Sequence, residues 1–279
     1  MTMELPVNPL KNLALAEPAN DSEPKEKDRQ FVTALSRGLQ ILQCFTRARP
    51  VLRAAEIARL IDLPQPTVWR LCYTLIQDGY LVHVEGSDKL RPNFPVLSLG
   101  FAAIANMPLA ELARPAMMEL AGRHQGAVSL GVRDGVCMIY LERCQGSAIV
   151  MRDLDVGSRV PLISSVTGWG YIAGRDKAAR ERMFDEIEAF GDPRWPEVLP
   201  KLRLALAAYD RNGYIVSKGL MHPEINAVAV PIAAADGTVT MAMSSGGISQ
   251  LFNDEKLAAL GTELKELAAR LGPAIKGGE

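Results

Sequence analysis

The sequence contains few of the residues on which catalysis and metal binding usually depend. The chain has only three histidines and four cysteines. No two cysteines stand at CxxC spacing, and no GxSxG, HExxH, Walker or GxGxxG pattern occurs. These absences exclude the common serine-hydrolase, zinc-peptidase and nucleotide-binding classes. The spacing of His222 from Cys137 and Cys144 is too unspecific to indicate a metal site. We therefore expect a protein that is not an enzyme and needs no cofactor or metal.

Cysteine usage and the lack of long hydrophobic runs both indicate the cellular compartment. Cys44, Cys72, Cys137 and Cys144 stand among apolar neighbours, which predicts reduced core thiols rather than disulfides. The uncharged stretch Pro95–Ala110 is shorter than the ~20 residues that span a bilayer, and it contains two prolines. The N-terminus lacks the basic region and apolar core of a secretory signal. We therefore expect a cytoplasmic protein with no membrane segment.

The net charge of −1 is unevenly distributed along the 279 residues. Residues 1–28 carry six Asp and Glu against three Lys, and they are polar with no sustained apolar period, so we expect a disordered arm. Residues 29–93 carry nine Lys and Arg against five Asp and Glu. This local basic surplus matches the electrostatic footprint of a phosphate-binding surface. The length and the 48% hydrophobic content predict two globular domains.

Residues 29–93 show the pattern of a winged helix-turn-helix domain. Apolar residues recur at helical spacing over 33–46, over 53–60 and from Pro64 to a C-terminal cap at Gly79. Pro64 suits the first turn of this third helix. The stretch "YLVHVEGSDKLRPN" then alternates, turns at 86–88 and returns, as a small hairpin does. The apolar stripes of the three helices comprise Leu35, Leu39, Leu42 and Phe45, then Ile57 and Leu60, then Val68, Leu71, Cys72, Leu75 and Ile76.

The polar face of the third helix is chemically suited to double-stranded DNA. An α-helix fits the major groove, where Gln pairs with adenine and Arg with guanine. Thr67 and the helix N-terminus suit a phosphate, and Lys89 and Arg91 at the wing suit the backbone or the minor groove. The predicted DNA-binding residues are Gln65, Pro66, Thr67, Trp69, Arg70, Tyr73, Lys89 and Arg91. Two alternatives stay open, namely a helical packing unit without nucleic acid and a Trp69 that belongs to the core.

Beyond the first domain, the pattern predicts a linker helix and an α+β domain. Residues 94–107 place Leu97, Phe101 and Ile104 on one stripe, which suits pairing with a second copy or, equally, a core position. Residues 108–275 contain two hairpins, with turns at Asp134-Gly135 and Asp236-Gly237, and a further strand in "AIVMRDLDVG". We expect a mostly antiparallel sheet. The expected helices cover 109–124, 165–173, 177–188, 197–212 and 254–271.

Three stretches carry a resemblance to a known family: "LSRGLQILQCF", "AAEIARLIDLPQPTVWRLCYTLIQDGYL" and "LDVGSRVPLISSVTGWGYIAG". Over residues 31 to about 272 the chain resembles the isocitrate lyase regulator (IclR) family of bacterial transcription factors. The resemblance implies a winged helix-turn-helix, a linker helix and a GAF/PAS-like effector-binding domain, assembled as homodimers or homotetramers. Trp69 stands where His is common in that family. Trp169 replaces the Lys of the family's usual "GKALLA".

The resemblance also implies an effector pocket in the second domain. Thr167, Ser244 and Ser245 would supply hydroxyl groups. The helix that begins at Ser165 would supply N–H groups that favour an anion. Arg152 would add a fixed charge if it points inward; a surface position is the alternative. For Ser244 and Ser245, the alternative is a strand that simply ends in a loop. The implied effector-binding residues are Ile149, Arg152, Val166, Thr167, Ser217, Ala227, Ser244 and Ser245.

Together these features predict a ligand-responsive transcriptional regulator, more specifically a repressor. The first domain would bind a palindromic operator, and the second would bind a small metabolite of the organic-acid type. Ligand binding would change the spacing of the two recognition helices in a dimer. The alternative is a ligand-independent DNA-binding or scaffold protein whose second domain only oligomerises.

Overall fold

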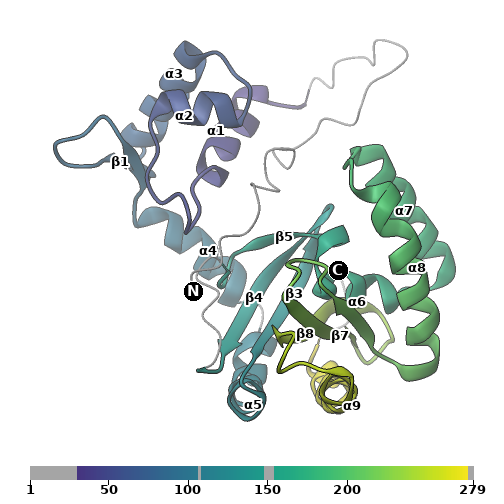
Figure 1. Ribbon diagram of the computed structural model, residues 1–279. Helices are drawn as coiled ribbons and strands as arrows, with labels where there is room; N and C mark the ends of the chain where they lie inside the picture. The colour runs from purple at the N-terminus through teal and green to yellow at the C-terminus, as the bar shows by residue number, and fades with distance from the viewer. Residues whose placement is uncertain (1–29, 106–107, 148–153, 276–279) are drawn as a thin grey trace. The chain divides into compact units, whose positions relative to one another are not determined.

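The computed structural model describes residues 30–105, 108–147 and 154–275 (Figure 1). Its internal contacts divide the chain into two compact units, with the division between Asn106 and Met107. Within the described ranges, no helix has the length and apolar character needed to cross a membrane. The first unit has one hydrophobic core and the second has two.

The first unit consists of small helices and a two-stranded hairpin. Its elements are α1 (Thr33–Gln43), α2 (Ala54–Leu60), α3 (Gln65–Gln77), β1 (Leu81–His83), β2 (Leu90–Pro92) and α4 (Pro95–Ala105). Strands β1 and β2 pair antiparallel, with Val82 opposite Arg91. Val68 and Cys72 of α3 are fully buried against Ile41 and Ile57 from the other two helices. The predicted order of three helices followed by a hairpin is therefore confirmed.

Local signals define both ends of α3. Pro66 stands in the first turn, where its missing N–H leaves no hydrogen bond unmade. The prediction placed Pro64 in the first turn, but Pro64 is the N-cap residue. Gly79 adopts a left-handed conformation with φ of 78°. Its N–H donates to the Ile76 carbonyl, 3.0 Å away. Because a residue with a Cβ is strained at this φ, the glycine ends the helix and directs the chain into β1.

Helix α1 differs from its prediction in length and in orientation. It ends at Gln43 instead of Thr46, because Thr46 exchanges backbone hydrogen bonds with Arg49 in a tight turn. Of the predicted apolar stripe, Leu35 is 64% exposed and Leu39 is 49% exposed. Leu42 and Phe45 of the stripe are partly buried against the core, and Ile41, outside the stripe, is fully buried in it. Apolar spacing therefore located the helix, but only the C-terminal half of the predicted stripe packs on the core.

The second unit is a six-stranded antiparallel sheet with helices on both faces. The strands follow the order β5-β4-β3-β8-β7-β6. They are β3 (Ala127–Asp134), β4 (Cys137–Gln145), β5 (Arg159–Pro161), β6 (Ile215–Lys218), β7 (Ile225–Ala233) and β8 (Val239–Ile248). The helices are α5 (Pro108–His124), α6 (Val166–Ala173), α7 (Lys177–Phe190), α8 (Trp195–Asn212) and α9 (Asp254–Leu271), with short 3₁₀ turns at Leu162–Ser164 and Gly272–Ala274. The chain is thus an α+β protein, as predicted.

Two cores lie on opposite faces of this sheet. Helices α5 and α9 cover one face, where they pack on Val128, Val228 and Met243 (Figure 1). Helices α6, α7 and α8 contribute to the core of the other face, which includes Tyr140 and Ala242. Because alternate residues of a strand point to opposite faces, neighbouring buried positions along β3, β7 and β8 face opposite cores.

The sequence missed two of the six strands. Strands β5 and β6 have only three and four residues, too few to show a clear alternation. Most of the strand expected in "AIVMRDLDVG" lies outside the described residues. Helix α7 runs two residues beyond its predicted end, to a left-handed Gly191. Helix α8 begins at Trp195 instead of Glu197.

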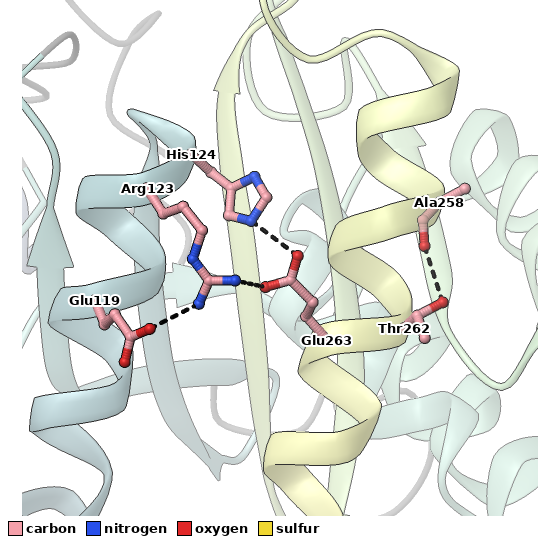
Figure 2. Close-up of polar contacts among 6 residues, drawn as sticks. All are labelled: Glu119, Arg123, His124, Ala258, Thr262 and Glu263. Atoms are coloured by element: carbon pink, nitrogen blue, oxygen red, sulfur yellow. Dashed lines mark hydrogen bonds and ion pairs between the residues drawn. The ribbon is translucent and has the colours of Figure 1, made fainter.

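Polar contacts join α5 and α9 where both helices cover the same face (Figure 2). Arg123 Nη1 lies 2.8 Å from Glu263 Oε2, and His124 Nε2 lies 3.0 Å from Glu263 Oε1. Arg123 also reaches Glu119, one turn earlier in α5, at 3.0 Å. Since these side chains are partly exposed, each contact contributes at most about 1 kcal/mol to stability. These contacts connect the two helices side by side. The apolar faces of both helices supply most of the packing energy.

Candidate functional site

The outward face of α3 carries five of the eight predicted DNA-binding side chains. The five are all exposed, namely Gln65, Pro66, Trp69, Arg70 and Tyr73. Thr67, on the same helix, is half-buried. Arg70 is the one charged residue in the thirteen of α3, and the helix contains no Asp or Glu. A carboxylate on this face would repel a phosphate backbone, so its absence favours contact with nucleic acid.

Trp69 lies at the boundary between α3 and the wing. Its side chain is 44% exposed, which contradicts the alternative that places it in the core. The centroid of its indole ring lies 6.3 Å from that of the His83 imidazole on β1, with the ring planes tilted by 52°. Part of the indole therefore packs on the wing, and the rest stays open to solvent.

The wing carries the remaining two predicted residues. Arg91, on β2, is exposed, and its guanidinium donates to the Pro92 carbonyl at 3.2 Å. Lys89 is half-buried and directly precedes the returning strand β2. The carboxylate of Asp88 pairs with Arg53 at 2.8 Å, so its negative charge is offset within the unit. Helix α3 and the wing together present aromatic side chains and three basic residues, Arg70, Lys89 and Arg91, against two acidic residues, Glu85 and Asp88, both in the wing.

A cavity of about 60 Å³ lies in the second unit, between the sheet and α6. Twelve residues line it: Ala127, Ser129, Tyr140, Arg143, Leu154, Val166, Ser217, Met221, Ile225, Ala227, Ser244 and Gly246. Four of the eight residues that the family resemblance implied are among them, namely Val166, Ser217, Ala227 and Ser244. A bound water molecule needs about 10–15 Å³ of cavity volume, so the cavity holds roughly four to six groups of the size of a water molecule.

Small residues create this space. Ala127 pairs with Gly246, Gly246 pairs with Ala227, and Ala227 pairs with Ser217, so a row of small side chains crosses four neighbouring strands. Large apolar residues elsewhere on the same face, such as Met138 and Ile215, fill the space between the sheet and the helices. Along the row no side chain is long enough to do so, and the cavity remains.

Among the described residues that line the cavity, Arg143 is the only charged one. Its Nη1 donates to the Ser129 hydroxyl at 2.7 Å, and its guanidinium carbon lies 5.7 Å from the centroid of the Tyr140 ring. Burial lowers the pKa of Arg143 below its ordinary value, and interactions with Tyr140 and Asp155 partly oppose this effect. Burial disfavours the cationic form because less water solvates its charge. An anion bound beside the guanidinium would stabilise that charge and would itself gain a charge-assisted hydrogen bond.

A β-bulge aims Arg143 at the cavity. On β3, Leu130 pairs with Glu142 and the next residue, Gly131, pairs with Tyr140, so Leu141 is an extra residue in β4. Without the bulge, residues three apart would point to opposite faces. With it, Tyr140 and Arg143 line the same cavity. Glu142 points to the opposite side, where its carboxylate pairs with Arg114 of α5 at 3.0 Å.

Thr167 supports the cavity wall rather than lining it. Its hydroxyl lies 2.7 Å from the Ser244 hydroxyl, and both residues are buried. The hydroxyl of Ser165 accepts from the N–H of Gly168 at 3.0 Å, so it caps α6. One of the helix's first N–H groups is therefore already satisfied by Ser165.

The structure corrects the prediction for Ser245. Ser245 is paired with Val128 and Val228, both of which pack in the core under α5 and α9. Its side chain thus points away from the cavity, because successive residues of β8 alternate and Ser244 faces inward. Ile149 and Arg152 lie outside the described residues.

Sequence reasoning missed several residues of the cavity wall. Arg143, Ser129 and Tyr140 lie on strands that were predicted, and simple alternation places Ser129 on the face of Ala127. The bulge in β4 shifts that alternation and leaves no sequence signal of its own. Among the described residues, no group of three or more His, Cys, Asp or Glu side chains could hold a metal ion.

Comparison with known proteins agrees with both units. The family model for the IclR helix-turn-helix domain matches residues 34–85, and that for the bacterial transcriptional regulator IclR C-terminal region matches residues 101–272. The HTH-type transcriptional regulator TsaQ1/TsaQ2 of Comamonas testosteroni is 28% identical over 90% of this chain and 87% of its own. The transcriptional repressor AllR of Escherichia coli is 24% identical over 87% and 90%. An IclR family regulator from Brucella abortus is 35% identical, with a TM-score of 0.78 over 92% and 97% of the two chains.

Proposed function

Because the chain belongs to the IclR family of bacterial transcriptional regulators, which are not enzymes, we propose that it is a repressor controlled by a small organic acid. Helix α3 and the wing bind a palindromic operator, and the cavity beside Arg143 binds the effector. Effector binding lowers the affinity of the dimer for its operator.

The position of Arg143 carries the effector part of this proposal. A guanidinium that faces a small cavity, and is the one charged group among the described residues that line it, is suited to binding a carboxylate through charge-assisted hydrogen bonds. The hydroxyls of Ser129, Ser217 and Ser244 can orient further polar atoms, and Leu154, Val166 and Ile225 supply an apolar wall. This lining supports an acid with a short hydrophobic part. An IclR homologue from Microbacterium hydrocarbonoxydans, 24% identical, was crystallised with 4-hydroxybenzoate, so this compound belongs in the first test panel.

Thermal melting against small carboxylates tests effector binding. A ligand at one hundred times its Kd stabilises the folded state by about 2.7 kcal/mol, which raises the Tm of a unit of this size by roughly 5–10 °C. The amide or methyl ester of an active acid should give no shift, because it lacks the charge that Arg143 recognises. If no carboxylate raises the Tm, or if the ester is as effective as the acid, the cavity does not bind an organic acid.

Operator binding requires a separate measurement. Selection from random duplexes should yield a palindrome whose half-sites lie about one helical turn apart. Gel-shift titration with the active acid should then show release of the DNA. Tighter binding with the acid would indicate an activator or a co-repressed system instead.

The second candidate function is a DNA-binding protein that does not respond to ligands. Its second unit would serve only to join copies of the chain. Persistent DNA affinity in the presence of every acid that raises the Tm would favour it. In that case the cavity binds ligand without coupling to the first unit.

We also propose a homodimer or a homotetramer. The outer surface of the linker segment is strongly apolar, since Phe94, Leu97, Leu99 and Phe101 are exposed in the single chain. Such a face is expected to pair with its counterpart from a second copy. Light scattering should give a mass of two or four chains, and the double variant Leu97→Glu, Phe101→Glu should shift it towards one.

A further inference from the structure

Two large aromatic side chains interrupt the otherwise polar face of α3. Trp69 is 44% exposed and Tyr73, one turn later, is 55% exposed. Arg70 lies beside them, and Lys89 and Arg91 follow on the wing. Hydrogen bonding to base edges explains Gln65 and Arg70. It does not explain an indole ring, whose single polar atom is a donor on an otherwise apolar body.

The surroundings of Trp69 favour nucleic acid over protein as its partner. Residues 29–93 carry four more basic than acidic side chains, and α3 itself has no carboxylate. A protein-binding surface built around an exposed aromatic residue has no need of this charge bias, whereas a DNA-binding surface does. The tilted contact with His83 places the indole against the wing and leaves the rest of the ring exposed.

The major groove offers one apolar group to such a ring. Each base pair displays hydrogen-bond donors and acceptors there, and only thymine adds a methyl group, at C5. Resting on the proposed DNA binding, we propose that Trp69 reads thymine in each half-site of the operator through contact with this methyl group. The contact adds discrimination at a position that the hydrogen-bonding residues of α3 do not read.

Replacing thymine by uracil in the selected operator tests this directly. The replacement removes the methyl group and leaves the Watson–Crick pair and the groove acceptors intact. Burial of one methyl group corresponds to about a fourfold change in affinity. We therefore expect one thymine per half-site at which uracil weakens binding about fourfold, and about fifteenfold when both half-sites are changed.

Variants assign the effect to Trp69. Trp69→Ala should bind the thymine operator more weakly and show no penalty for uracil. Trp69→Phe, which keeps an apolar ring, should retain part of the penalty. Arg70→Ala serves as the matched control on the same helix, because it should weaken binding and keep the full uracil penalty. Circular dichroism checks that each variant is folded.

The results separate this inference from the proposed function. If the wild-type protein selects an operator but tolerates uracil at every thymine, DNA binding stands and the methyl contact is wrong. A uracil penalty that persists in Trp69→Ala, or that disappears in Tyr73→Ala instead, also overturns it. If no operator is selected at all, the proposed function fails together with the inference.

Discussion

Arg143 Nη1 and Ser129 Oγ lie 2.7 Å apart, across the neighbouring strands β4 and β3. The two residues are register partners, so the hydrogen bond runs straight across the floor of the cavity. It holds a long, flexible cationic side chain in place before any ligand arrives. A site that is ordered in advance loses less conformational entropy on binding.

We expect Arg143→Met to weaken binding of an acidic effector roughly ten- to a hundredfold. A hydrogen bond to a charged group is worth about 1.5–3 kcal/mol, and methionine keeps much of the volume without the charge. Isothermal titration calorimetry measures the change. Lys201→Met is the control, because this exposed lysine pairs with Glu197 on the surface of α8. Equal losses in both variants would contradict a specific role for Arg143.

The hydrogen bond between Thr167 and Ser244 predicts a combined effect on stability and binding. Thr167→Val leaves the buried Ser244 hydroxyl without this partner, so the free energy of unfolding should fall by about 1–3 kcal/mol. Effector affinity should fall as well, because Ser244 lines the cavity. Thermal melting and calorimetry on the same variant separate the two quantities. An unchanged Tm would mean that the pair contributes no net stability.

Ser245→Ala should behave differently from its neighbour. The Ser245 hydroxyl is buried with no hydrogen-bond partner among the described residues, and it points away from the cavity. Removing an unsatisfied buried hydroxyl should leave the Tm unchanged or raise it. The free energy of unfolding should rise by at most about 1–3 kcal/mol. Effector affinity should not change. A loss of affinity comparable to that of Ser244→Ala would show that Ser245 contacts the ligand.

On the DNA side, backbone and base contacts should separate by their mutational signatures. Arg91→Ala is expected to weaken binding to all sequences alike and to reduce the salt dependence, since it removes a phosphate contact. Gln65→Ala and Arg70→Ala should instead change the preferred sequence in a binding-site selection. If both helix variants keep the wild-type preference, the recognition face has been assigned wrongly.

The cysteines should be unreactive in the folded protein. All four are free and buried. Burial raises the pKa of the Cys72 thiol to about 11, and the thiols of Cys44 and Cys137 are raised to the same value. Because the thiolate is the reactive form, a thiol reagent at pH 8 should label none of them in native protein and all four after denaturation. Rapid native labelling would show that a core opens readily.

The same pKa values predict a loss of stability at alkaline pH. An unfolded thiol ionises near pH 9, whereas the buried thiol stays protonated up to about pH 11. The unfolded state therefore releases protons first, and the free energy of unfolding should fall as pH rises from 9 towards 11. Cys72→Ala should show a smaller fall than the wild-type protein when urea unfolding is compared at pH 8 and pH 10.

Much of the fold follows from local signals that a sequence displays. The apolar period of α3 and the left-handed glycine after it depend on neighbouring residues only, so the helix and its end were predicted correctly. The long hairpin strands β3, β4, β7 and β8 alternate over eight to ten residues, which is enough to reveal them. The exposed face of α3 was also predicted, because a strong stripe of core residues defines its opposite side.

Tertiary structure decided the features that depend on strand pairing. The bulge at Leu141 brings Tyr140 and Arg143 to the same face, and the row from Ala127 to Ser217 exists only once four strands are in register. Sequence alone gave Ser244 and Ser245 equal standing, yet the pleat sends their side chains to opposite faces. The cavity beside Arg143 arises from contacts between residues far apart in the chain, and no local pattern encodes such contacts.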